Sequence, residues 1–123
     1  MITFIHPYFT QNDTRGGIIG LCNTFCFEEI NFITSHKNVV RGGHYHRYTK
    51  EMFIILEGKI KITLFHYHNP HLTQEYIVTP LQCFYIEPFV VHTFETLEDS
   101  KWLNALSKKM DTIDKDFHTD IQS

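Results

Sequence analysis

The sequence has no run of lysine and arginine, and it contains only three arginines, Arg15, Arg41 and Arg47. Nucleic-acid binding needs clustered basic side chains, so this scarcity and the net charge of −3 argue against nucleic acid as a partner. No apolar stretch reaches the roughly 18 residues of a membrane span. The first ten residues lack the basic start and apolar run of a signal peptide, so we expect a cytoplasmic protein.

Cysteine is also scarce, with Cys22, Cys26 and Cys83 as the three examples. An odd number without a secretion signal argues against a disulfide framework and favours reduced thiols. No repeat, low-complexity tract or flexible linker divides the 123 residues. We therefore expect a single domain over residues 1–123, with its core motifs in 13–106 and a polar tail over 107–123.

Aromatic residues are plentiful, and the local patterns indicate an all-β fold. Ile60, Ile62 and Leu64 alternate with polar residues, which puts them on one face of a strand that follows a turn at Gly58. Eight to ten such short strands, without a long amphipathic helix, are typical of a sandwich or barrel. A short helix in the tail is the one exception that the pattern allows. The other expected strands cover residues 25–34, 39–41, 52–56, 74–79, 84–86, 90–96 and 103–106.

Nine histidines stand out in a chain of this size. His44 and His46 are two residues apart, so on a strand both imidazoles point to the same face. Glu51 lies near the start of the next strand, and His92 comes from a separate one. Three imidazoles and a carboxylate that converge inside a barrel could hold a divalent metal or keep a base in a dry pocket. We interpret the remaining histidines as surface residues, including the loop residues His66, His68 and His71.

These residues also carry a resemblance to a known superfamily. His44-x-His46-x4-Glu51-x6-Gly58 resembles the first motif of the cupins, and Ile86-x-Pro88-x3-His92 resembles the second. In the second motif Phe89 or Val90 replaces the usual glycine. The resemblance implies a double-stranded β-helix, the cupin jelly roll, which agrees with the strand count.

A narrower resemblance lies outside those motifs. Asp13-Thr14-Arg15-Gly16, Val40-Arg41-Gly42-x-His44 and Asp114-Lys115-Asp116-Phe117 are similar to signatures of two groups of cupins. These are the dTDP-4-dehydrorhamnose 3,5-epimerases and the dTDP-4-keto-6-deoxyhexose 3,4-ketoisomerases. The resemblance implies a homodimer that acts on a nucleoside diphosphate sugar with a ketone at C4 and requires no cofactor, with 3,4-ketoisomerisation favoured.

The resemblance also implies roles for individual residues. Arginine forms bidentate bonds with phosphate, so Arg15, Arg41 and Arg47 are expected to bind the diphosphate. His44 is the expected base, and His46 carries or orients the second proton. Tyr85, Tyr45 and His92 are candidate hydrogen-bond donors to the substrate, and Tyr85 is counted with His44 and His46 among the expected catalytic residues. One departure is Phe32, where the ketoisomerases tend to carry a tyrosine.

A second departure keeps other functions open. The position of Glu51 is often glutamine in the ketoisomerases, which work without a metal, whereas here the set His44, His46, Glu51 and His92 is intact. This set resembles metal-holding cupins, including the zinc-bearing domains of some capsule-sugar epimerases. One alternative is therefore a metal-dependent enzyme, such as a dioxygenase, with zinc, iron or manganese. Another is a non-enzymatic cupin that binds a small ligand.

Overall fold

A computed structural model describes residues 1–110 and 115–120. The chain is all-β, and its described residues contain no helix and hence no helical segment suited to crossing a membrane. Eleven strands follow one another: β1 Ile2–Ile5, β2 Phe9–Asp13, β3 Gly16–Gly20, β4 Glu29–Ser35, β5 Val40–His44, β6 Glu51–Glu57, β7 Ile60–His66, β8 Asn69–Val78, β9 Cys83–Ile86, β10 Val90–Thr96 and β11 Ser100–Leu106.

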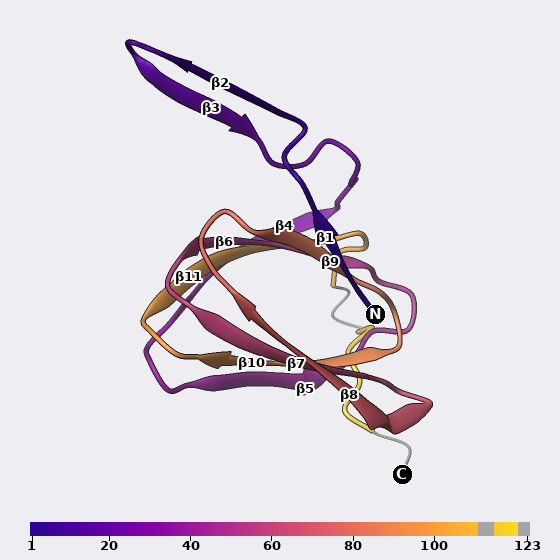
Figure 1. Ribbon diagram of the computed structural model, residues 1–123. Helices are drawn as coiled ribbons and strands as arrows, with labels where there is room; N and C mark the ends of the chain where they lie inside the picture. Colours follow the sequence, from indigo (N-terminus) through magenta and orange to yellow (C-terminus); the bar gives the residue numbers. More distant parts are fainter. Residues whose placement is uncertain (111–114, 121–123) are drawn as a thin grey trace.

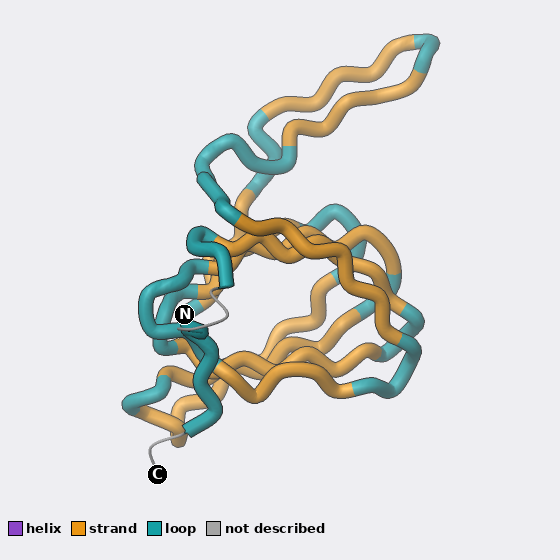
Figure 2. The backbone as a smooth tube through the Cα atoms, turned by 180° about the vertical axis from the view of Figure 1, so that it is seen from behind, coloured by secondary structure: helices purple, strands orange, loops and turns teal. Residues whose placement is uncertain are grey.

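Two antiparallel sheets face each other and form a flattened barrel (Figure 1). The five-stranded sheet has the order β1-β9-β6-β11-β4, and the four-stranded sheet has the order β5-β10-β7-β8. Strand neighbours are mostly distant in sequence, which is the connectivity of a jelly roll. The tube in Figure 2 shows the space enclosed between the sheets, which side chains fill.

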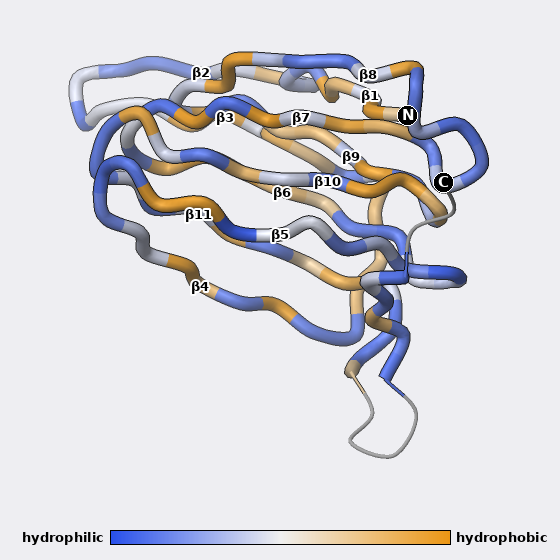
Figure 3. Tube along the Cα trace, turned by 90° about the horizontal axis from the view of Figure 1, so that it is seen from below, coloured by the Kyte–Doolittle hydropathy of each residue, from blue (hydrophilic) through white to orange (hydrophobic). Residues whose placement is uncertain are grey.

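The core lies where the apolar faces of the two sheets meet. Ile60, Ile62 and Leu64 of β7 are fully buried, as their alternation with polar residues predicts. They pack against Phe53 of β6 and Trp102 of β11 in the opposite sheet. Figure 3 shows the same alternation in β4, where hydrophilic and hydrophobic residues follow one another at the edge of the five-stranded sheet. The all-β prediction is confirmed.

Several predicted boundaries are wrong. The strand expected over 25–34 begins only at Glu29, and the loop expected at 68–71 already belongs to β8 from Asn69 onward. The pattern also missed β1 and the β2–β3 hairpin, because residues 2–13 show no regular alternation of apolar and polar side chains. The part of the tail that the structure describes holds no helix; residues 111–114 and 121–123 lie outside the described residues.

The tail instead returns to the barrel. His118 and Tyr45 exchange backbone hydrogen bonds of 3.0 Å in each direction, which fixes the tail across the end of the barrel. Asp116 is buried there, although the tail as a whole is polar. This segment lies beside His44 and His46, because Phe117 stacks on the ring of His44 and the carbonyl group of Asp116 contacts His46, so the tail is part of the site described next.

Candidate functional site

A cavity of about 300 Å³ opens between the two sheets. Its walls are largely apolar, with Ile33, Phe53, Phe94, Trp102 and Phe117 among the lining residues. His44, Glu51 and His92 also line it, and Arg41 contributes from β5. A largely apolar cavity with a few convergent polar groups is the usual form of a small-molecule site.

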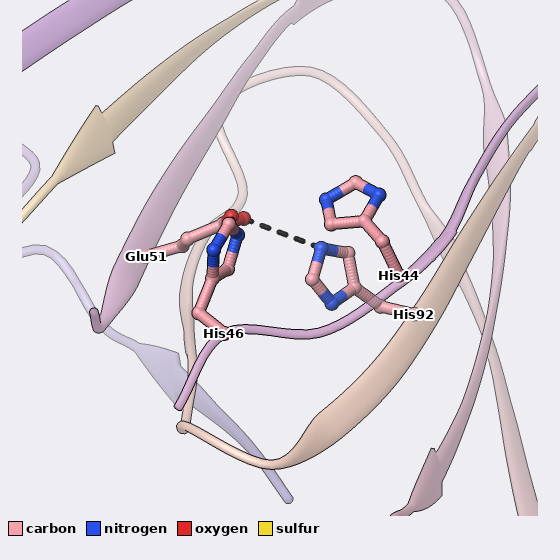
Figure 4. A group of neighbouring side chains, drawn as sticks. All are labelled: His44, His46, Glu51 and His92. Carbon is pink, nitrogen blue, oxygen red and sulfur yellow. Dashed lines mark ion pairs between the residues drawn. The ribbon is translucent and has the colours of Figure 1, made fainter. Parts of the chain in front are cut away.

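The polar groups form one compact cluster, drawn in Figure 4. His44, His46, Glu51 and His92 each offer one ligand atom, and these atoms lie within 4.8 Å of one another. The rings of His44 and His92 are 4.5 Å apart, and those of His44 and His46 are 5.3 Å apart. Among the described residues this is the only such group of histidine, cysteine and acidic side chains. The predicted convergence of the four residues is thus present in the structure.

Backbone geometry at the end of β5 brings His44 close to His92. Gly42 and Gly43 have φ angles of 106° and 76°, which residues with a side chain rarely adopt. A Cβ atom on Gly42 would lie 2.5 Å from the carbonyl oxygen of His92. The sequence Arg41-Gly42-Gly43-His44 therefore allows β5 to approach β10 at the point where both supply a histidine.

His46 is held from the other side by the turn before β10. The backbone N–H of Phe89 donates a 2.7 Å hydrogen bond to the carbonyl oxygen of His46. Phe89 has a φ of 64°, in the left-handed region where glycine is favoured. Phe89 therefore adopts the backbone conformation that glycine adopts most easily, at a position where the second motif usually has a glycine. The turn forms with phenylalanine in that place.

Hydrogen bonds to carbonyl groups fix the orientation of two imidazoles. Nδ1 of His46 donates to the carbonyl oxygen of Asp116, and Nδ1 of His92 donates to that of Val90 at 3.0 Å. Because a carbonyl oxygen only accepts, the proton of each neutral ring sits on Nδ1 and the Nε2 lone pair faces inward. Both Nε2 atoms meet the Glu51 carboxylate, His92 at 3.4 Å and His46 in closer contact.

Two lone pairs facing a carboxylate repel it unless a positive charge lies between them. A proton on an imidazole provides one solution, and a bound cation provides the other. In the proton case, burial alone would lower the pKa of His46, but the hydrogen bond and charge of Glu51 outweigh it and raise that pKa. Burial would likewise raise the pKa of Glu51, but the neighbouring His92 and His46 hold it well below its usual range.

His44 has the opposite electrostatic character. Burial and the nearby His92 lower its pKa to about 4, so its imidazole is neutral at pH 7. Phe117 stacks on this ring with a centroid distance of 4.3 Å. A neutral histidine beside one whose pKa is raised is an arrangement that separates a proton acceptor from a proton donor.

The same residues fit a divalent cation. Nε2 of His46 is buried and, apart from its close contact with the Glu51 carboxylate, has no hydrogen-bond partner, so its lone pair is available to a cation. Nδ1 bonds to carbonyl groups orient metal-binding histidines in many proteins. Asn104 donates a 3.4 Å hydrogen bond to Glu51 and so helps to orient the carboxylate. Three histidines and one carboxylate suit zinc, iron or manganese.

Sequence reasoning missed the role of the tail. The Asp116 carboxylate accepts hydrogen bonds from the backbone N–H groups of Arg47, Tyr48 and Thr49, at 2.7, 2.9 and 2.9 Å. These bonds fix the loop that follows His46. Asp116 and Phe117 belong to the segment that resembles a signature of the sugar-nucleotide cupins, and this resemblance was the signal in the sequence. Periodicity gave no reason to place the two residues beside His46.

The three arginines occupy different surroundings. Arg41 is at the cavity and donates to the carbonyl oxygen of Thr34 at 3.2 Å and to the hydroxyl of Ser35. Arg47 does not line the cavity, and its side chain lies 3.8 Å from Asp120. Arg15 lies at the end of the β2–β3 hairpin and pairs with Asp13 at 2.7 Å, away from the cavity (Figure 1). Phosphate binding by each of them stays a prediction.

The candidate tyrosines lie outside the cavity. Alternation along β9 points Phe84 into the core and Tyr85 to the outer face of the sheet, where its hydroxyl contacts Thr24 and lies 3.4 Å from Cys22. Tyr45 is buried and donates a 3.1 Å hydrogen bond to Asp120. The structure thus brings neither hydroxyl to the histidine cluster, and a catalytic role of Tyr85 is unsupported within one chain.

Phe32 is also outside the cavity. It is 59% exposed on the outer face of β4, whereas its neighbour Ile33 lines the cavity. The side chain that occupies the inward position on this strand is therefore isoleucine, which donates no proton.

The fold and the histidine–glutamate cluster together define a cupin, and comparisons with known proteins agree. QdtA, a sugar 3,4-ketoisomerase from Thermoanaerobacterium thermosaccharolyticum solved in complex with TDP, superposes with a TM-score of 0.79 at 21% identity, over 97% of this chain and 88% of that one. A 3,4-ketoisomerase from Helicobacter canadensis gives 0.80 at 20% identity, over 97% and 90%. The rmlC epimerase of Mycobacterium tuberculosis gives 0.77 at 16% identity, over 96% and 68%. These likenesses establish the shared cupin fold.

Sequence comparison identifies the family. Residues 11–109 match the model of the polysaccharide biosynthesis C-terminal domain, and the chain belongs to that family. A curated relative is the UDP-2-acetamido-2,6-beta-L-arabino-hexul-4-ose reductase of Pseudomonas aeruginosa, which is 36% identical over 56 residues. That match covers 46% of this chain and only 15% of the reductase.

Proposed function

We propose that this protein is an isomerase or epimerase of a nucleoside diphosphate-linked 4-keto-6-deoxyhexose, with 3,4-ketoisomerisation as the favoured reaction. The observation that carries the proposal is the convergence of His44, His46 and His92 in an apolar cavity that Arg41 adjoins. A cavity of about 300 Å³ is at the lower end of ligand sites and suits a sugar ring. The nucleoside diphosphate would then lie outside it, within reach of Arg41.

The chemistry requires two proton movements. The C4 ketone acidifies the hydrogen on C3, and neutral His44 accepts that proton, which leaves an enediolate across C3 and C4. Return of a proton to C4, with transfer of the O3 proton to O4, moves the ketone to C3. Return of the proton to the opposite face of C3 instead inverts that carbon. Protonated His46 is the group suited to stabilise the oxyanion.

The names of similar proteins support this substrate class without fixing the nucleotide. QdtA and its variants were solved with TDP or TDP-4-keto-6-deoxyglucose, and the curated relative is named for a UDP-linked 2-acetamido-4-ulose. Both names describe a nucleoside diphosphate sugar with a carbonyl at C4. We therefore treat the C4 ketone as the constant part of the substrate and the nucleotide base, thymine or uracil, as the variable part.

A metal-dependent cupin enzyme is the second candidate, because the four donor atoms lie within 4.8 Å of one another. His44, His46, Glu51 and His92 would hold the cation. A bound divalent metal would act as a Lewis acid toward a substrate oxygen. His44 could then no longer serve as the base, so the two candidates assign it different roles.

The test is incubation in heavy water, followed by NMR, with TDP-4-keto-6-deoxyglucose and with a UDP-linked 2-acetamido-4-ketohexose. Deuterium at C4 and a ketone at C3 indicate a ketoisomerase, whereas deuterium at C3 with the ketone still at C4 indicates an epimerase. We expect His44→Ala to abolish exchange while His66→Ala, at the end of β7 and outside the cluster, retains it. Bound substrate without exchange in the wild type, metal-loaded or not, would refute the proposal and favour a ligand-binding protein.

Chelation distinguishes the two candidates. If His44 is the base, activity survives complete removal of metal, as checked by elemental analysis. If the cluster acts through a cation, activity disappears on chelation and returns with zinc, iron or manganese.

A further inference from the structure

Two cysteines that are far apart in the sequence meet on the outer face of the five-stranded sheet. Cys83 begins β9, which lies between β1 and β6. Alternation along β9 points Cys83 and Tyr85 outward, while Phe84 points into the core. Cys22 follows β3 and packs against this outward group. The thiol of Cys83 donates a hydrogen bond to the sulfur of Cys22, so the two sulfur atoms are neighbours.

The surroundings of Cys22 stabilise a thiolate. Its Sγ atom lies 3.4 Å from the hydroxyl oxygen of Tyr85 and 3.7 Å from that of Thr24, and these two hydroxyl groups contact each other. The Lys50 ammonium group lies 4.3 Å from the centre of the Tyr85 ring. Burial would raise the pKa of Cys22, but the hydrogen bonds from Tyr85 and Thr24 outweigh it and lower that pKa. The Cys22 sulfur is therefore suited to act as a nucleophile.

Cys83 has the opposite character. It is 2% exposed, whereas Cys22 is half-buried. Burial and the neighbouring Cys22 raise the pKa of Cys83 to about 12, so this thiol keeps its proton at pH 7. An accessible nucleophilic sulfur in contact with a protected thiol is the arrangement of an attacking and a resolving cysteine. Neither cysteine belongs to the described residues that line the cavity of the histidine cluster.

We propose that Cys22 and Cys83 form a site of reversible thiol–disulfide exchange, in which a small-molecule disulfide of the glutathione type oxidises the pair to an intramolecular disulfide. The Cys22 thiolate attacks one sulfur of the small disulfide, forms a mixed disulfide and releases one thiolate. The Cys83 sulfur then attacks Cys22, and its proton passes to the second departing thiolate. Two cysteine thiols are thereby oxidised to one disulfide, and the small disulfide is reduced to two thiols.

The new bond would join the segment after the β2–β3 hairpin to a central strand of the barrel. Cys22 lies between β3 and β4, and β9 pairs with β6 on one side and β1 on the other. A covalent link removes conformational freedom from the segment that it attaches. We therefore expect oxidation to slow amide hydrogen exchange in residues 21–25 at least about tenfold. The inference concerns the outer face of the sheet and is independent of the proposed reaction.

The test incubates the reduced wild-type chain with oxidised glutathione, blocks the remaining thiols with iodoacetamide and maps the cysteine peptides by mass spectrometry. We expect two peptides joined through Cys22 and Cys83, which dithiothreitol separates again. Absence of oxidation, a bond from either cysteine to Cys26, or a mixed disulfide on Cys22 that never closes would overturn the proposal. Unchanged amide exchange in residues 21–25 after oxidation would also overturn it. This mapping uses the wild type, so it does not depend on the folding of a variant.

Three serine variants assign the steps. Cys83→Ser should stop at the mixed disulfide on Cys22, because the resolving sulfur is missing. Cys22→Ser should leave Cys83 reduced, because the buried thiol has lost the neighbour that reacts first. Cys26→Ser is the matched control, since Cys26 is exposed and takes no part in the two steps, and it should form the disulfide as fast as the wild type. Loss of the disulfide in Cys26→Ser, or oxidation of Cys83 in Cys22→Ser, would overturn the proposal.

Discussion

His46 and Asp116 are 70 residues apart in the sequence, yet the imidazole of one donates a hydrogen bond to the backbone carbonyl of the other. The carboxylate of the same aspartate accepts hydrogen bonds from three successive backbone N–H groups after His46. One residue of the tail therefore fixes both the tautomer of a site histidine and the loop that carries it.

We expect Asp116→Ala to lower the free energy of unfolding by about 3 kcal/mol, because it leaves three successive backbone donors, including that of the buried Thr49, without their acceptor. Chemical denaturation followed by circular dichroism measures the change. Glu75→Ala is the control, because the Glu75 side chain is 61% exposed and has only a 4.0 Å surface ion pair with Lys61, so it should contribute less than about 1 kcal/mol. Equal stability of the two variants would show that the Asp116 bonds do not stabilise the fold.

The cluster should bind one divalent cation per chain after removal of metal and titration with cobalt or zinc. The d–d absorption of cobalt and elemental analysis of zinc provide readouts that do not depend on activity. His92→Ala removes one of the four donors and should weaken binding by about 100-fold or more. His66→Ala should bind as the wild type does, since His66 is outside the cluster. Identical binding by both variants would place the ion elsewhere.

Arg41 should dominate the affinity for the nucleoside diphosphate. We expect Arg41→Ala to weaken the binding of UDP or dTDP about tenfold, equivalent to ~1.4 kcal/mol, in titration calorimetry. Arg41→Lys should recover only part of this, because lysine lacks the bidentate geometry. Arg47→Ala provides the comparison, since Arg47 does not line the cavity. A larger loss from Arg47→Ala than from Arg41→Ala would reassign the phosphate site.

The thiols should react in a fixed order. Burial raises the pKa of Cys83 to about 12, so it should resist iodoacetamide up to about pH 10. Burial would also raise the pKa of Cys22, but hydrogen bonds from Tyr85 and Thr24 outweigh it and hold that pKa below its usual value. A lowered pKa means that thiolate forms at lower pH, so alkylation of Cys22 should begin below the usual thiol range. Mass spectrometry of pulse-labelled peptides, with exposed Cys26 as internal reference, measures this; labelling of Cys83 before Cys22 would contradict it.

Sequence patterns were sufficient for the local part of the fold. Strict alternation in β7 predicted which side chains are buried, because successive residues of a strand face opposite sides. The same rule predicted that His44 and His46 lie together, which they do, although β5 ends at His44 and His46 follows the strand. The two motifs added Glu51 and His92. Boundaries failed where alternation was weak, as in the hairpin, whose side chains face no core.

The sequence by itself therefore determined the all-β class, through local periodicity, and the four residues of the cluster, through the spacing of residues within the two motifs. Only the tertiary structure decided the rest, since it depends on contacts between distant segments. The return of the tail made Asp116 and Phe117 part of the site. Alternation along β9 points the Tyr85 side chain away from the site. The β2–β3 hairpin extends away from the barrel, so Arg15 at its tip lies far from the cavity. No local pattern reports which face of a sheet will meet a cavity or where a hairpin will point.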